Sequence, residues 1–337
     1  MSTSLKEEFK LFKFGLGHDS PILFITSQWK CSSSIYLLWR LFWLLWHVGW
    51  VVASPVVMVL YQANSPAEGA KWLIYLTHTT LLLTALTSTL DFLTVFYLSY
   101  TRRGRATLSS WNHEKPVTGP PLKKDIIFQG EFTVLSGLEA CTTPWYVKLT
   151  WFLYGVISSS NILVTIMYWA VVFDGNVEAV DVIINSVNSF FIISNGLVTA
   201  MPFRILHFVY PVLYGAAYFI FTYIYYAAGG TNILNRDIIY GALDWNHAYP
   251  TVLGVVIGVL VCAPIVHLGL FALYTFRIFL FSKIHSGNFK LSSELDSHQH
   301  IAGSSRQTTT LEINLEQPSG VEHKGNATQG TKNETGL

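Results

Sequence analysis

The stretch WLIYLTHTTLLLTALTSTLDFLTVFYLSY, residues 72–100, is apolar and long enough to cross a bilayer, which takes about 20 helical residues. Polar side chains recur within it at spacings of three and four, so they share one face of a helix: Thr77, Thr80, Thr84, Thr87 and Asp91. Lipid offers these groups no hydrogen bonds, so their face should point toward other helices or a wet cavity. The stretch therefore predicts an integral membrane protein with a polar interior.

The composition of the whole chain points the same way. Of its 337 residues 51% are hydrophobic and 12% are charged, whereas soluble domains are about 25% charged. We expect an all-α integral membrane bundle, because six windows are apolar and long enough to span a bilayer: about 35–61, 72–100, 146–172, 182–202, 206–228 and 251–282. They leave an N-terminal segment (1–34), a six-span membrane domain (35–285) and a tail (286–337), which is too poor in apolar residues to order itself.

The distribution of basic residues predicts how the protein sits in its membrane. Lysine and arginine collect before the first span, in the 101–145 loop and after the last span, while the opposite loops are nearly bare. This asymmetry places both termini in the cytoplasm, and an even number of spans requires the two termini to share a side. The choice between plasma membrane and endomembrane stays open, as does palmitoylation of Cys31 beside the first span. The net charge of +1 indicates no nucleic acid partner.

Two further expectations concern the region between the fourth and fifth spans. The run Pro202-Phe203-Arg204 is so short that it predicts a tight antiparallel pair of these two spans. Arg204 and Arg277 lie near predicted cytoplasmic ends of spans, where long basic side chains reach the lipid headgroups.

The polar seam of the second span contains one candidate nucleophile. Thr77 could act in this way if a base were near, because a free hydroxyl stays protonated at neutral pH. Alternatively, these threonines bond to carbonyls three or four residues back, or hold helices together. The fourth span has a polar face of its own, made of Asp181, Asn185, Asn188 and Asn195. Two such faces could enclose a polar cavity, lined by the seam and Asn185, or could bond directly to each other.

Three histidines within or beside spans are candidate general bases: His47 in the first span, His207 at the start of the fifth and His267 in the sixth. The alternative is that each merely donates to a backbone carbonyl. No spacing of His, Cys, Asp or Glu indicates a metal site, and no motif indicates a cofactor.

Ordered motifs across residues 6–285 resemble the rolling stone family of animal multi-span membrane proteins. The stretches that carry the resemblance are EEFKLFKFGLGH (7–18), SQW (27–29), YLLWRLFWLLWHVGW (36–50), WLIYLTHTTLLL (72–83), INSVNSFFIISNGLVTAMPFRILHFVYPVLYGAAYFIFTYIYYAAGGTN (184–232) and IYGALDW (239–245). The resemblance implies a protein linked to myoblast fusion, with a role in cell–cell fusion or membrane organisation.

More distantly, the chain is similar to the androgen-induced and androgen-dependent intramembrane hydrolases, which cleave fatty-acid esters with a threonine and a histidine. The threonine of that group lies in a YLT context, which matches Tyr75-Leu76-Thr77. The histidine lies in an NHxxH context on the fourth span, and Asn188 occupies its position here. Asparagine cannot accept a proton at neutral pH, so the resemblance implies either a substitute base, His207, His267 or His47, or no hydrolysis.

Three functions therefore follow as hypotheses, and whether the chain is an enzyme stays open among them. The first is a membrane organiser or fusion factor, with membrane lipids around it and protein partners at the 101–145 loop or the tail. The second is a hydrolase of fatty-acid esters that uses Thr77. The third is a transporter of lipids or small molecules.

Overall fold

The computed structural model describes residues 8–18, 20–61, 66–101, 104, 143–173, 175 and 179–284. Six helices in this part are long and apolar enough to cross a membrane, which confirms the predicted all-α fold class. Most of the 101–145 loop and residues 286–337 lie outside the described residues, and so do the predictions made for them. The helices up to Phe281 form one unit.

The first three spans are α2 (Ser33–Tyr61), α3 (Leu76–Tyr100) and α5 (Trp145–Met167) with its π-helical end η4 (Tyr168–Val172). A 3-10 helix, η3 (Pro66–Ile74), leads into α3. The fourth span joins α6 (Ala179–Val182), the π-helical turn η5 (Ile183–Val187) and α7 (Asn188–Val198). The fifth span is η6 (Ile205–Phe208) and α8 (Val209–Ala227). The sixth holds η7 (Trp245–His247), α9 (Ala248–Ile257), η8 (Gly258–Cys262) and helical residues 263–284.

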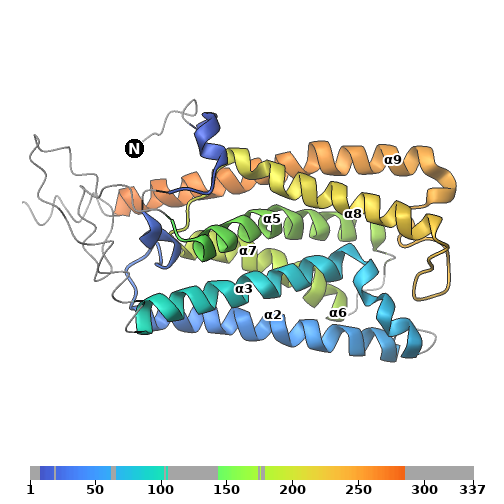
Figure 1. Ribbon diagram of the computed structural model, residues 1–337, viewed down its shortest axis with the longest axis horizontal. Coiled ribbons are helices and arrows are strands. Elements are labelled where there is room, and N and C mark those ends of the chain that lie inside the picture. Colours follow the sequence, from blue (N-terminus) through green and yellow to red (C-terminus); the bar gives the residue numbers. More distant parts are fainter. Residues whose placement is uncertain are drawn as a thin grey trace, which may run out of the picture. The chain divides into compact units, whose positions relative to one another are not determined.

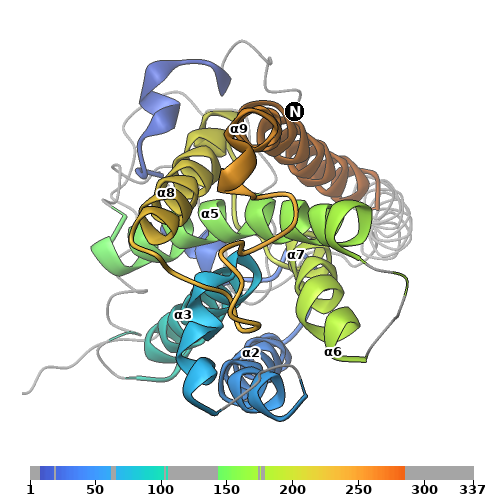
Figure 2. The same cartoon turned by 90° about the vertical axis from the view of Figure 1, so that its right-hand side faces the viewer.

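Helix α5 packs against several of the other spans. It contacts α3, α7 and α8, while α2 packs along α3 (Figures 1 and 2). The expected tight pair of the fourth and fifth spans is therefore wrong, because α7 and α8 pack mainly on α5 and not on each other. Gly155 of α5 makes room for α8: Tyr210 lies 3.3 Å from the position that a Cβ on Gly155 would take, and small residues let neighbouring helices approach closely.

Large aromatic rings fill the centre of the bundle. Trp151 of α5 lies 4.9 Å from Phe24, and Trp43 of α2 lies 4.8 Å from Phe191 of α7, measured between ring centroids. Each ring is almost fully buried. The outward faces carry aliphatic side chains instead; Leu45 of α2 remains 64% exposed, as expected of a surface that meets lipid.

The segment before α2 is fastened to the bundle by its backbone. Ser27 and Thr199 form an isolated antiparallel bridge. The Gln28 amide donates to the Val198 carbonyl at 2.8 Å, and the Trp29 indole N–H donates to the Leu197 carbonyl at 2.7 Å. The SQW motif thus provides donors for the carboxyl end of α7, whose last carbonyls lack partners within the helix.

Arg204 and Arg277 do not reach toward headgroups, so that expectation is wrong. Both are buried, at 7% and 2% exposed. Arg204 donates to the carbonyls of Lys13, Gly15 and Gly17 at 3.2, 2.6 and 2.8 Å, and its guanidinium stacks on the Trp151 ring. Arg204 thus supplies hydrogen-bond donors to several carbonyls of the N-terminal segment from one side chain.

Candidate functional site

Thr77 lies in the first turn of α3, at a helix end that another part of the chain approaches. The N-cap residue, Tyr75, makes no side-chain cap hydrogen bond. The Tyr240 phenol, from the loop before η7, lies beside the Thr77 side chain and the backbone of Leu76 and Thr77. Burial raises the pKa of Tyr240 to about 12. Its phenol is therefore protonated at neutral pH and cannot serve as a base for Thr77.

The Thr77 hydroxyl donates to the side-chain oxygen of Asn185 at 3.3 Å. Asn185 belongs to η5, the π-helical turn that interrupts the fourth span. Such turns shift the direction of side chains and are frequent at functional sites. The contact holds Thr77 in place, but an amide oxygen does not take up a proton at neutral pH. The arrangement therefore binds the hydroxyl without activating it.

The three candidate bases lie elsewhere in the bundle. His47 pairs with Ser88 at 2.9 Å, and its ring packs on Phe191. His267 lies between the Ser159 hydroxyl, at 2.9 Å, and the carbonyl of Arg204, at 3.0 Å.

His207 packs its ring against Trp151, with centroids 5.0 Å apart, and beside Tyr210. Among the hydrogen bonds of the described residues, none joins His47, His207 or His267 to Thr77. The structure therefore does not assemble a threonine–histidine pair from these candidates.

Asn188, at the position of the hydrolase histidine, is buried at 3% exposed on α7. Its amide nitrogen donates to the Ile184 carbonyl at 2.8 Å. Its side-chain oxygen has no hydrogen-bond partner among the described residues, and the same holds for Nε2 of His47. An unpartnered buried acceptor costs about 1–3 kcal/mol. A water or a ligand group that donates a hydrogen bond to the Asn188 oxygen would therefore be bound favourably.

The remaining threonines of the seam bond within α3 or to its neighbours. Thr84 and Thr87 donate to the carbonyls four residues earlier, at 2.7 and 2.8 Å. Thr84 also accepts from the Asn161 amide of α5 at 2.9 Å. Thr80 lies 3.1 Å from the Tyr214 hydroxyl of α8. The seam thus meets polar groups from several helices.

Asp91, at the other end of the seam, pairs with Arg40 of α2 at 2.9 Å. Arg40 also donates to Asn195 at 2.9 Å and to the Tyr36 hydroxyl at 2.5 Å. Both charged groups are about 3% exposed. One signal of this pairing is present in the sequence: a lone arginine and a lone aspartate within two apolar spans each need an opposite charge.

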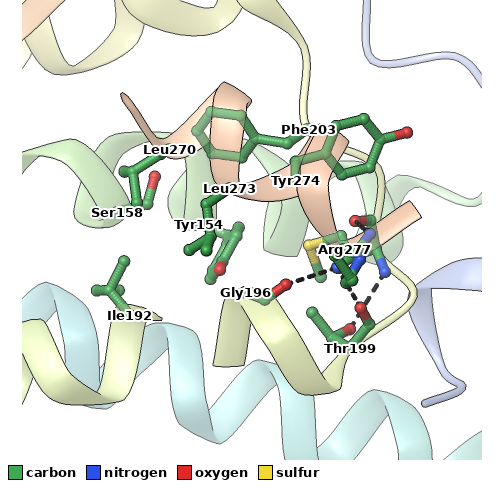
Figure 3. Close-up of a pocket in the computed structure, with 11 residues that line it drawn as sticks. Tyr154, Ser158, Ile192, Gly196, Thr199, Phe203, Leu270, Leu273, Tyr274 and Arg277 are labelled. Atoms are coloured by element: carbon green, nitrogen blue, oxygen red, sulfur yellow. Dashed lines mark hydrogen bonds between the residues drawn. The ribbon is translucent and has the colours of Figure 1, made fainter. Parts of the chain in front are cut away.

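Arg277 is a second arginine whose role the sequence did not indicate. Figure 3 shows its guanidinium directed at the carboxyl end of α7, where it donates to the carbonyls of Gly196, Thr199 and Met201. A cavity of about 20 Å³ lies beside it, between Tyr154 and Leu273. That volume holds about one water, which is far less than an acyl chain needs. Across the described residues, no three His, Cys, Asp or Glu side chains gather as a metal site.

Comparisons with known proteins show a similarity to one family. A profile of the family described as "Protein rolling stone" matches residues 125–290. The chain is also 27% identical to "Protein rolling stone" of Drosophila melanogaster over 252 residues, 72% of this chain and 79% of that protein. Over these residues the chain is similar to the rolling stone family. Within the profile's match lie Asn185, Asn188, Tyr240 and Arg277 of the sites described above. No solved structure matches the chain.

Proposed function

We propose that this protein, which is similar to the rolling stone family, acts in cell–cell fusion or membrane organisation without a catalytic step of its own. The observation that carries the proposal is the hydrogen bond from the Thr77 hydroxyl to the Asn185 amide oxygen. The hydroxyl of the candidate nucleophile therefore donates to a group that is not a base. The fusion role itself is inferred from the resemblance to the rolling stone family. The orientation with both termini in the cytoplasm belongs to the same proposal and rests on the distribution of basic residues.

The polar interior supports an organising role on physical grounds. Inside a bilayer, helices are not driven together by the hydrophobic effect, so packing and polar contacts between helices select their arrangement. The bonds of Thr77 to Asn185 and of Thr84 to Asn161 join α3 to two other spans. They make a defined bundle whose outer surfaces and loops are available to lipids and partners.

The proposal is tested by a content-mixing assay between cells that depend on this protein for fusion. Cells depleted of it should fuse less, and re-expression of the wild type should restore fusion. Thr77→Val should restore fusion equally, because valine keeps the volume of threonine and removes only the hydroxyl. Surface abundance and unfolding stability of the two proteins serve as controls. A Thr77→Val protein that is abundant and stable but does not support fusion would contradict the absence of chemistry at this residue.

The second candidate, a fatty-acid ester hydrolase, is favoured by one observation. Thr77 lies at the amino end of α3, where backbone N–H groups and the Tyr240 phenol converge. Groups of this kind stabilise the oxyanion of an acyl transfer. The missing part is a base within hydrogen-bond reach of the threonine, about 2.6–3.2 Å away.

Labelling with a fluorophosphonate probe separates the two candidates. Such a probe forms a stable adduct with an activated hydroxyl, so we expect no Thr77-dependent labelling of the folded wild type in membranes. Thr77→Ala is the test variant, and Thr84→Ala, which removes a buried hydroxyl of the same seam, is the matched control. Labelling that disappears in Thr77→Ala but persists in Thr84→Ala would establish Thr77 as a nucleophile and overturn the non-catalytic proposal.

A further inference from the structure

The beginning of the described chain exposes large apolar side chains. In the 3-10 helix η1 (Leu11–Phe14) and the residues before it, Leu11 is 89% exposed, Phe12 67% and Phe9 55%. Farther along the same N-terminal segment, Ile22 and Phe24 are 6% and 3% exposed, because they pack into the bundle. The exposure is therefore confined to one short stretch of the segment.

This stretch is held at the level where a membrane-spanning helix begins. Figures 1 and 2 show η1 outside the ring of helices, beside the beginning of α8. The Tyr210 hydroxyl, from the first turn of α8, donates to the Phe14 carbonyl at 3.0 Å. Arg204 donates to the carbonyls of Lys13 and Gly15. Its backbone is thus fixed to the bundle while its side chains point away.

The exposed side chains are continuous with the surface that meets lipid. Leu213, one turn after Tyr210 on α8, is 61% exposed, and Ile220 farther along the helix is 58% exposed. Phe14 packs its ring on Tyr210, with centroids 5.7 Å apart. An apolar surface therefore runs from the outside of α8 onto the N-terminal segment.

Basic residues alternate with the apolar ones. Lys10 and Lys13 flank Leu11 and Phe12 in the sequence, and Lys13 is also 3.5 Å from Glu8, which is itself buried. A short segment with aromatic and leucine side chains beside lysines is typical of interfacial anchors, which bury the apolar groups at the headgroup boundary and attract anionic lipid. This charge pattern fits a lipid leaflet better than a dry protein interface, where lysine is depleted.

We propose that residues Glu8–Phe14 form an interfacial anchor, which inserts Phe9, Leu11 and Phe12 into the leaflet around the beginning of α8. Lys10 and Lys13 contact the phosphates of anionic lipids in that leaflet. Arg204 and Tyr210 hold the anchor at this depth through its backbone. The anchor couples the composition of one leaflet to the bundle, and it does not depend on the fusion role or on Thr77.

The test measures depth directly in the full chain. Single spin labels are placed at Leu11→Cys and Phe12→Cys in a background without Cys31, Cys141 and Cys262, reconstituted in nanodiscs of phosphatidylcholine with or without phosphatidylserine. Accessibility to oxygen and to a water-soluble nickel complex then reports depth. Labels at Leu45→Cys on α2 and Asp237→Cys in an exposed loop serve as lipid and water references.

We expect the labels at 11 and 12 to be clearly less accessible to nickel than the label at 237, and to lie at a shallower depth than the label at 45. Phosphatidylserine should move them deeper, and the double variant Lys10→Glu/Lys13→Glu should abolish that shift. Nickel accessibility equal to that at 237 in both lipid mixtures would overturn the proposal. Dipolar coupling between labels of two copies would also overturn it, because a second chain would then cover this surface.

Discussion

Asp91→Asn is expected to lower the free energy of unfolding by about 3–5 kcal/mol, because it leaves the Arg40 charge buried without its counter-ion. The pair is joined at 2.9 Å and nearly inaccessible. Asparagine keeps the size of the side chain and still accepts one hydrogen bond, so the loss reports the charge and not a cavity.

Arg40 links three helices, which makes its pairing more important than that of a surface residue. It is carried by α2, bonds Asp91 of α3 and Asn195 of α7, and reaches Thr199 just after α7 at 3.3 Å. Loss of the carboxylate therefore weakens an interaction at the junction of three spans. In a membrane no nearby water can take the place of the lost carboxylate beside the Arg40 guanidinium.

Unfolding by detergent titration, followed by the fluorescence of the protein's tryptophans, measures the change. Asp237→Asn, in an exposed loop, is the matched control and should stay within about 0.5 kcal/mol of the wild type. The double variant Arg40→Met/Asp91→Leu should recover most of the stability, because an apolar pair of similar size often replaces a buried ion pair without loss. Equal stabilities of Asp91→Asn and Asp237→Asn would show that the ion pair does not hold the bundle.

Arg277→Met is expected to cost about 3 kcal/mol or more, since it removes the donors from several buried carbonyls at once. Hydrogen bonds from a charged donor contribute about 1.5–3 kcal/mol each, and a buried acceptor left alone costs about 1–3 kcal/mol. Arg277 donates to Gly196 at 2.8 Å and to Met201 at 3.0 Å, and it also bonds the Thr199 carbonyl (Figure 3). Methionine preserves the apolar stem and removes only the guanidinium.

The lysine variant distinguishes a fork of donors from a simple positive charge. Arg277→Lys keeps the charge but concentrates its donors on one nitrogen, so it should recover less than half of the loss. Arg236→Met, in an exposed loop, is the matched control and should leave unfolding unchanged within error. An Arg277→Lys protein as stable as the wild type would mean that charge alone, and not the capping of α7, is what this position needs.

The membrane fold could be predicted from the sequence because its signals are local. A run such as 72–100 reports its length and apolarity residue by residue, and the threonine seam follows from the helical period alone. The fold class and the six spans within the described residues were both accessible in this way. Boundaries moved by a few residues; α3 begins at Leu76, since the residues before it form the tighter helix η3.

The neighbours of α5 could not be predicted, because they depend on which surfaces fit. A short link between two spans suggests that they are partners, yet α7 and α8 both pack on α5. Gly155 has no Cβ, so it leaves room for Tyr210 of α8 to lie close to α5. The periodicity of α7 or α8 does not show that the surface of α5 fits either of them.

The candidate site divides in the same manner. The polar character of Thr77, Asn185 and Asp91, and the direction in which they face, follow from their spacing within apolar spans, because lipid cannot hydrogen-bond them. Which group each one meets is a matter of position between helices: an amide for Thr77 and a guanidinium for Asp91, with His47 and His267 hydrogen-bonded elsewhere and His207 packed against Trp151. Side chains that are more than a hundred residues apart meet only after the bundle has packed, and the chemistry open to Thr77 depends on that meeting.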